Sequence, residues 1–391
     1  MVTKIRIMVD ASPLIGPMSG IGRYTQRLIH ALQELLGPEQ VTAFLDSLRV
    51  DPRNVLAAAG LAPTNARHFL LPRRLLLHLW RYGTASPLLL DRDAELIHST
   101  NYRVFPKTNR PQIVGVHDTT IWTNPEWHFA GRMRELTEQL GQLRHIDGII
   151  VHTEHVAKQV TELAGMPRDQ VHVVPHGVDP ALGGTLNLTE PEGSHAETPA
   201  LPDRYGLEPG YVLYLGTIEP RKNLPLLFEA YRDLPPATRL RHPLVIAGAP
   251  GWKTGPIYAA AADLQAEGSV RFLGRVAEDD LTAVLRSAAL FVYPSLEEGF
   301  GLPPLEAMAH GVATLVSDAP ALVEVSGAGA VVLSREDPSG WTSTIKALLA
   351  DDEARQLLAH RGHVHASRYT WRRTAELTID VYRQVIARGS R

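Results

Sequence analysis

The residues best suited to chemistry lie in the stretch Glu298-Gly-Phe-Gly-Leu-Pro-Pro-Leu-Glu306. Glu298 follows an apolar run over 288–294 that predicts a buried strand, whereas Glu306 lies in a run of good helix formers. Gly299 and Gly301 let the backbone turn tightly and approach a ligand. Free N–H groups and the positive end of a helix dipole lie between the two carboxylates. This suits a ligand with hydroxyls at two places and a diphosphate between them, such as a sugar nucleotide.

A second motif, Gly216-Thr-Ile-Glu-Pro-Arg-Lys-Asn223, directly follows a predicted strand over 211–215. The guanidinium of Arg221 binds phosphate oxygens at two points, and the ammonium of Lys222 adds a compact charge. With Gly216 at the strand end, the motif predicts a grip for a diphosphate. A solvated turn with two surface cations is the alternative, just as Glu298 and Glu306 could be ordinary loop and helix charges.

Two motifs in the first half of the chain leave alternatives open. Ser19-Gly-Ile-Gly-Arg-Tyr24 lacks the GxGxxG pattern, so Gly20 and Gly22 belong either to a phosphate-facing loop or to a tight turn that opens a helix. His117 ends a predicted strand, where a cleft residue is expected, although a lone histidine is usually structural. Asp118 could cap the next segment, orient His117 or contact an acceptor.

Two other segments bear on metal and membrane binding. The pair His152-Thr-Glu-His155 has no further ligands nearby in the sequence, so we predict no metal site. Segment 72–82 mixes three arginines with leucines and a tryptophan. It is either a core helix with charged ends, which we favour, or a basic amphipathic helix on the anionic inner face of a membrane.

Composition excludes several classes of protein. The chain has 391 residues, which suggests two domains, and 44% apolar and 21% charged residues are typical of a globular protein. A net charge of −3 gives no argument for nucleic acid binding, and the lack of cysteine excludes disulfides and thiolate catalysis. No apolar run approaches the roughly 20 residues of a membrane span, and the N-terminus lacks a signal-peptide layout. We therefore predict a cytoplasmic protein, with peripheral membrane contact if 72–82 lies on lipid.

The predicted elements alternate between strands and helices, which indicates parallel βαβ units. The fold class is therefore α/β, with two facing Rossmann-like domains and a ligand cleft between them at the carboxyl ends of the strands. Helices are predicted over 22–36, 131–145, 153–164 and 371–386. Strands are predicted over 4–9, 41–45, 95–98, 112–117, 148–152, 171–174, 211–215, 244–248, 270–273, 290–293, 312–316 and 330–333. The predicted domains are 1–178 and 210–370, joined by a linker over 179–209 whose stretch 183–199 is polar and turn-rich.

These motifs together resemble the large family of retaining glycosyltransferases called family four, whose GT-B fold has two facing Rossmann-type domains. The resemblance covers most of the chain. It is carried by Ser19–Tyr24, His117-Asp118, Gly216–Asn223, Phe272-Leu-Gly-Arg-Val276 and Glu298–Glu306. The form EGFGLPPLE is highly specific, whereas the likeness of 117–128 to mannose-transferring enzymes of bacterial surface polysaccharides is weak.

The resemblance implies a role for each matching residue. Arg221 and Lys222 bind the donor diphosphate, Glu298 holds hydroxyls of the donor sugar, and Glu306 holds the ribose. The resemblance further implies that backbone N–H groups of Phe300, Gly301 and Leu302 face phosphate or sugar. It implies that Arg275 and Val276 border the nucleobase and that Gly20 and Gly22 approach the phosphates. His117 is expected near the reacting sugar. The first domain receives the acceptor, and residues 371–391 cross back to it.

The sequence thus predicts a retaining, metal-independent hexosyltransferase that uses a GDP- or UDP-linked mannose or glucose donor, without a cofactor. The acceptor is a glycan or lipid-linked hydroxyl in bacterial glycan or glycolipid synthesis. Two rival functions are a sugar-nucleotide epimerase of similar architecture and a non-catalytic nucleotide-sugar sensor. Turnover of the donor alone would indicate the epimerase, and donor binding without any turnover would indicate the sensor.

Overall fold

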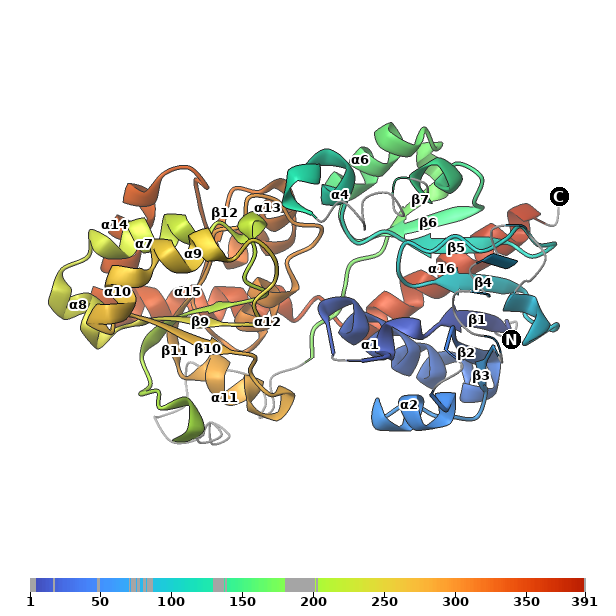
Figure 1. Cartoon of the computed structure of the whole chain (residues 1–391), viewed down its shortest axis with the longest axis horizontal. Coiled ribbons are helices and arrows are strands. Elements are labelled where there is room, and N and C mark those ends of the chain that lie inside the picture. The colour runs from blue at the N-terminus through green and yellow to red at the C-terminus, as the bar shows by residue number, and fades with distance from the viewer. Residues whose placement is uncertain are drawn as a thin grey trace. The chain divides into compact units, whose positions relative to one another are not determined.

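The chain folds into two units, each built around one parallel sheet (Figure 1). The first unit comprises Met1–Gly177 and Tyr369–Arg391, and the second comprises Val178–Arg368. The computed structural model describes residues 5–389 except 17, 48–49, 70, 72–74, 76–77, 80–81, 83–86, 129–136, 138, 180–200 and 202. Most of segment 72–82, the start of the predicted helix 131–145 and the stretch 183–199 therefore lie outside the described residues.

The first unit has a seven-stranded parallel sheet in the order β3-β2-β1-β4-β5-β6-β7. Its longer helices are α1, α2, α6 and α16, and the single turn α4 follows β5. The strands are β1 (Ile7–Asp10), β2 (Val41–Leu45), β3 (Ala66–His68), β4 (Leu96–Ser99), β5 (Gln112–Gly115), β6 (Gly148–Val151) and β7 (Val171–Val173). The helices are α1 (Gly20–Leu36), α2 (Pro52–Ala58), α4 (Thr120–Thr123), α6 (Glu154–Ala164) and α16 (Trp371–Gly389).

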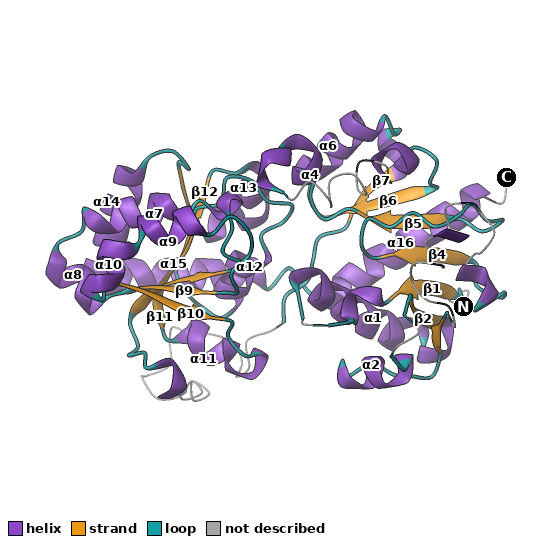
Figure 2. Ribbon diagram, viewed as in Figure 1, coloured by secondary structure: helices purple, strands orange, loops and turns teal. Residues whose placement is uncertain are grey.

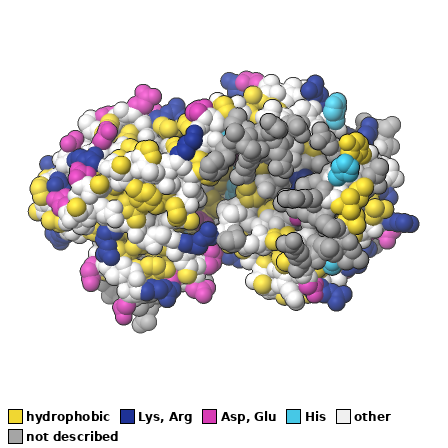
Figure 3. Space-filling model, viewed as in Figure 1, with side chains coloured by type: hydrophobic (Ala, Val, Ile, Leu, Met, Phe, Trp, Pro, Cys, Tyr) yellow, Lys and Arg dark blue, Asp and Glu magenta, His cyan; other side chains and the backbone are white. Residues whose placement is uncertain are grey.

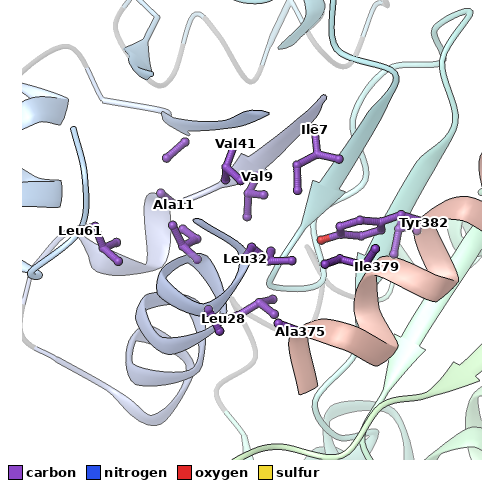
Figure 4. Packing of buried hydrophobic residues seen from close by; sticks show 14 of the residues in the cluster. Ile7, Val9, Ala11, Leu28, Leu32, Val41, Leu61, Ala375, Ile379 and Tyr382 are labelled. Atoms are coloured by element: carbon purple, nitrogen blue, oxygen red, sulfur yellow. The ribbon is translucent and has the colours of Figure 1, made fainter. Parts of the chain in front are cut away.

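Helix α1 shows how the sequence positions these elements. The hydroxyl of Ser19 accepts a hydrogen bond from the N–H of Gly22 and caps the helix, which ends before Gly37 at φ 92°. Its apolar face, with Leu28 and Leu32 fully buried, packs against β1, β2 and α16 (Figure 4). Tyr382 of α16 lies in the same core, so the last helix of the chain completes the first unit.

The second unit has a six-stranded parallel sheet in the order β10-β9-β8-β11-β12-β13, with helices on both faces (Figure 2). The strands are β8 (Tyr211–Leu215), β9 (Leu244–Ala247), β10 (Val270–Gly274), β11 (Ala288–Tyr293), β12 (Thr314–Ser317) and β13 (Val331–Leu333). The helices are α7 (Leu224–Arg232), α8 (Pro236–Arg241), α9 (Gly255–Ala260), α10 (Ala262–Glu267), α11 (Leu281–Arg286), α12 (Leu302–Ala309), α13 (Pro320–Ser326), α14 (Pro338–Ala350) and α15 (Asp352–Ala366).

Each sheet has one point at which its strand order reverses. In the first unit β1 lies between β2 and β4, and in the second β8 lies between β9 and β11. The loops that follow two such neighbouring strands leave the sheet in opposite directions, which opens a crevice at the carboxyl ends. Any ligand site of the second unit is therefore expected where β8 and β11 end.

The α/β prediction with two parallel sheets is confirmed, and the differences are local. The glycines at 20 and 22 belong to the first turn of α1, so they open a helix instead of forming a separate loop. Strand β3 was missed because it has only three residues, two of them Arg67 and His68. Thr153 caps α6 as predicted.

The surface of the second unit carries charges of both signs. In the view of Figure 3, Lys and Arg side chains alternate with Asp and Glu over the helices of this unit. This mixture agrees with the small net charge of −3. Among the helices of the described residues, none combines the length and apolar character that crossing a membrane requires.

Candidate active site

The loops after β8 and β11 bring two cations and a carboxylate together at the reversal point of the second sheet. Arg221 and Lys222 follow β8, and Glu298 follows β11. Nη1 of Arg221 donates to Oε2 of Glu298 at 2.8 Å, and Nζ of Lys222 donates to Oε1 at 2.5 Å. Each oxygen of the Glu298 carboxylate therefore has its own cationic donor.

Tyr293, the last residue of β11, completes the environment of Lys222. Nζ of Lys222 donates to its hydroxyl at 2.8 Å and lies 5.1 Å from the centre of its ring. Lys222 and Glu298 are both buried. An ammonium has three N–H donors, and among the described residues Lys222 uses two of them, so one donor remains for a ligand.

The network sets the ionisation of both buried partners. Burial raises the pKa of Glu298, but the charges of Arg221 and Lys222 outweigh it and hold that pKa at about 2. Burial and the neighbouring Arg221 lower the pKa of Lys222, whereas Glu298 raises it. Glu298 is therefore a stable carboxylate at neutral pH, and such a weakly basic group is a poor proton acceptor.

A second carboxylate, Glu219, was not singled out by the sequence analysis although it lies within the quoted motif. Nε and Nη2 of Arg221 donate to its Oε1 at 3.1 and 2.9 Å, and Nη1 of Arg221 also reaches the carbonyl of Glu297 at 3.0 Å. Glu219 is buried. The site therefore pairs two cations with two carboxylates, and buried charges in proteins are usually paired in this way.

A tight turn ties the two loops together. Asn223 adopts the left-handed conformation at φ 53°, which an asparagine tolerates better than most residues. Its amide donates to the carbonyls of Pro294 and Arg335 at 3.3 and 3.0 Å. The N–H of Leu296 donates to the carbonyl of Arg221 at 2.9 Å. These hydrogen bonds fix the cations relative to Glu298.

Helix α12 begins beside this network. Gly301 precedes the helix at φ 92°, and a Cβ there would lie 2.4 Å from Cδ2 of Leu322, so glycine is required on two grounds. Pro303 and Pro304 carry no N–H. In the first turn of α12, Leu302 is therefore the residue whose backbone N–H has no acceptor within the helix. Among the described residues, the N–H groups of Gly301 and Leu302 donate to no acceptor. Both are available to an anion.

The remaining donor-site candidates of the second unit lie at other strand ends or along α12. Glu306 is buried within α12, and Phe300 is buried just before it. Gly216 directly follows β8 and has a φ of 156°, and a Cβ there would lie 2.8 Å from the hydroxyl of Tyr214. Arg275 and Val276 follow β10, and Arg275 is exposed.

Candidates in the first unit lie after β5 and in α1. Nε2 of His117 is 2.8 Å from the carbonyl of Thr100. Oδ1 of Asp118 accepts from the N–H and hydroxyl of Thr120 at 3.0 and 2.7 Å, so Asp118 caps the following turn, and among the described residues its side chain makes no hydrogen bond to His117.

The two glycines of α1 differ in their surroundings. A Cβ on Gly22 would lie 3.0 Å from the carbonyl oxygen of Pro13, whereas one on Gly20 would meet nothing within 4 Å. Close packing therefore explains the glycine at 22 but not the one at 20.

Comparison with known proteins defines the class. Residues 203–364 match the family model described as Glycosyl transferases group 1, and residues 18–182 match the one described as Glycosyltransferase Family 4. The sequence is 30% identical over 388 residues to the O-antigen chain mannosyltransferase B of Escherichia coli, with 97% of this chain and 100% of that protein covered. The chain belongs to glycosyltransferase family 4, and it is a hexosyltransferase.

Solved structures agree on the architecture. Sucrose-phosphate synthase from Thermosynechococcus elongatus is similar with a TM-score of 0.71 and 18% identity, covering 98% of this chain and 100% of that one. Anabaena HepE in complex with UDP and glucose is similar with a TM-score of 0.69 and 16% identity, covering 96% and 98%. These likenesses show the GT-B fold. The epimerase and the sensor gain no support from the comparisons.

Proposed function

We propose that this protein transfers a mannosyl unit from a nucleotide diphosphate mannose to a hydroxyl of a bacterial glycan, with retention of the anomeric configuration. The observation that carries the proposal is the buried network of Arg221, Lys222 and Glu298 beside the free N–H groups at the start of α12. The similarity to an O-antigen mannosyltransferase supports the choice of mannose and of a glycan acceptor.

The geometry favours stabilisation of the leaving diphosphate by fixed donors. The remaining donor of Lys222 and the N–H groups of Gly301 and Leu302 are directed groups that need no rearrangement when charge develops. Arg221 contributes positive charge held in place by Glu219 and Glu298. No metal ion is needed for this role of the chain's own residues.

The state of Glu298 is informative about the reaction. A carboxylate whose two oxygens are bound by cations and whose pKa is about 2 is a weak nucleophile and a weak base. Glu298 is therefore suited to binding and positioning. We infer that the leaving phosphate itself accepts the proton of the attacking hydroxyl on the same face of the sugar, which produces retention.

The test compares donors and acceptors. We expect a nucleotide diphosphate mannose such as GDP-mannose to raise the melting temperature of the purified protein, because a ligand that prefers the folded state stabilises it. Incubation with donor and a mannose-containing glycan should release nucleotide diphosphate and extend the glycan with an α-linked residue from an α-linked donor. An isomerised donor in the absence of acceptor, or an inverted linkage, would refute the proposal.

We also propose that segment 72–82 contacts the inner face of the membrane, where a lipid-linked acceptor would be presented. Its support is the sequence pattern of arginines among leucines. Sedimentation with anionic lipid vesicles tests it, and binding equal to that of neutral vesicles would refute it.

A further inference from the structure

Three histidines of the first unit lie together because each follows one of three adjacent strands. His117 comes after β5, His152 directly after β6 and His176 shortly after β7, and β5, β6 and β7 are neighbours in the sheet. One ring nitrogen from each lies within 4.8 Å of the others. His152 and His176 are buried, and His117 is partly buried.

Backbone carbonyls fix the tautomers of two of these rings. A carbonyl oxygen only accepts, so Nε2 of His117, 2.8 Å from the carbonyl of Thr100, carries a proton. For the same reason Nδ1 of His152, 2.9 Å from the carbonyl of Val174, carries a proton. In neutral imidazoles the other nitrogen of each ring then bears a lone pair.

Those two lone pairs point at one another. Nδ1 of His117 and Nε2 of His152 are 3.1 Å apart, which is hydrogen-bond distance with no proton to share between the neutral rings. A cation is required to make the contact favourable, and it is either an additional proton or a metal ion.

We propose that His117, His152 and His176 form a binding site for a transition-metal ion such as Zn²⁺. With Zn–N bonds of about 2.0–2.1 Å, ligand nitrogens in a tetrahedral site lie about 3.3 Å apart, close to the 3.1 Å of the first pair. The rings of His152 and His176 have centroids 3.8 Å apart and an interplanar angle of 38°, so His176 must reorient its ring to place a nitrogen on the ion. The fourth ligand of a tetrahedral ion would be a water molecule or an anion.

The surroundings fit an imidazole site. Metal-binding histidines commonly donate their second ring nitrogen to a backbone carbonyl, as His117 and His152 do. The ring of Tyr24 lies edge-on to all three imidazoles, with centroid distances of 5.0, 5.0 and 4.7 Å. Because the cluster offers nitrogen and no carboxylate, it should select Zn²⁺, Cu²⁺, Ni²⁺ or Co²⁺ over Mg²⁺ and Ca²⁺.

This site goes beyond the proposed transferase function and does not depend on it. The sequence predicted no metal because the three ligands are far apart along the chain, and only the order of the strands brings them together. A bound ion would occupy Nδ1 of His117, the residue expected near the reacting sugar. Metal binding would therefore stabilise the first unit and compete with any role of that nitrogen.

The test uses untagged full-length protein stripped with EDTA and titrated with ZnCl₂ and CoCl₂ at neutral pH. We expect saturable binding of one ion per chain, a raised melting temperature, and visible Co²⁺ bands of tetrahedral intensity. MgCl₂ should cause no shift. Failure of Zn²⁺ to bind with this stoichiometry, or a Co²⁺ spectrum of the octahedral aqua type, would overturn the proposal.

Two variants remove a ligand and keep its backbone bond. His152→Asn places an amide N–H near the position of Nδ1 and deletes Nε2, and His117→Gln places an amide N–H near Nε2 and deletes Nδ1. Each should weaken Zn²⁺ binding at least about ten-fold and abolish the Zn²⁺-induced rise in melting temperature. His145→Asn, an exposed histidine of the same unit, is the control and should bind as the wild type does. Unweakened binding in both folded ligand variants would overturn the site.

Discussion

Replacement of Glu298 by glutamine tests the electrostatic account of the second unit most directly. Glutamine keeps the size of the side chain but removes the charge. Its carbonyl oxygen can accept from only one of the two cations, so its NH₂ group must face the other, either Nη1 of Arg221 or Nζ of Lys222. Both are donors only, and the contact becomes repulsive.

The size of the effect follows from the pKa. Lowering the pKa of Glu298 from 4.5 to about 2 corresponds to about 3 kcal/mol of stability at pH 7, since one pKa unit is about 1.4 kcal/mol. Removing one partner of a buried ion pair costs about 3–5 kcal/mol in other proteins, which agrees. For a unit of this size the melting temperature should fall by roughly 6–12 °C.

The dependence on pH gives the sharper measurement. A carboxyl group whose pKa is lowered by folding adds its full contribution to the free energy of unfolding at pH values above its pKa in the unfolded chain. That contribution is lost as the pH falls toward the pKa of the group in the folded protein. The difference between wild type and Glu298→Gln should therefore shrink by about 2 kcal/mol between pH 7 and pH 3.

Urea unfolding of both proteins at the two pH values measures this difference, in which the titration of all other groups cancels. Glu208→Gln, which replaces an exposed carboxylate of the same unit, is the matched control and should change stability little at either pH. A Glu298→Gln protein as stable as wild type, or a difference that does not depend on pH, would refute the reasoning.

Three further predictions follow from the same contacts. Combining Lys222→Gln with Glu298→Gln should recover part of the stability that either single change loses, because no buried charge then stays unpaired. Turnover of the double variant should stay reduced by orders of magnitude. Recovery of turnover would contradict a role of these residues in the reaction. Gly301→Ala should cost about 1–3 kcal/mol and weaken donor binding in calorimetry, whereas Gly255→Ala, where a Cβ meets nothing within 4 Å, should be neutral. Tyr382→Phe should cost about 1–3 kcal/mol in thermal unfolding, because its buried hydroxyl, 2.7 Å from a ring nitrogen of His98, would be lost, and an unchanged melting temperature would exclude that contribution.

The sequence predicts those features of the fold that depend on local patterns. The apolar runs over 41–45 and 211–215 predicted the first and last residues of β2 and β8 correctly, and Thr153 was identified as the cap of α6. The apolar run over 288–294 predicted a strand, and the glycines and prolines of 298–306 predicted a tight turn and a helix, as found. These patterns are formed by residues that are neighbours in the sequence, so they can be recognised without knowledge of the tertiary structure. The short edge strand β3 has too few residues to show a pattern.

Contacts between distant segments could be predicted only in outline. Arg221 and Glu298 are 77 positions apart in the sequence. They meet because β8, which precedes Arg221, pairs with β9 on one side and on the other side with β11, which precedes Glu298. Periodicity indicates that strands exist but not their order. For this reason the pairing of the two cations with Glu298 and Glu219 was not anticipated, and neither was the meeting of three histidines in the first unit.

The charge balance of the second unit limits how it can bind an anion. Two cations and two carboxylates in one network sum to no net formal charge, which explains how Lys222 stays buried and Arg221 partly buried without a ligand. A diphosphate therefore does not meet an uncompensated positive cluster. Its binding must draw on donors that remain unused, at Lys222 and at the start of α12, whose dipole carries no counter-charge in the first turn. Directional hydrogen bonds, more than net charge, should then decide affinity, and donor binding should depend only weakly on salt concentration.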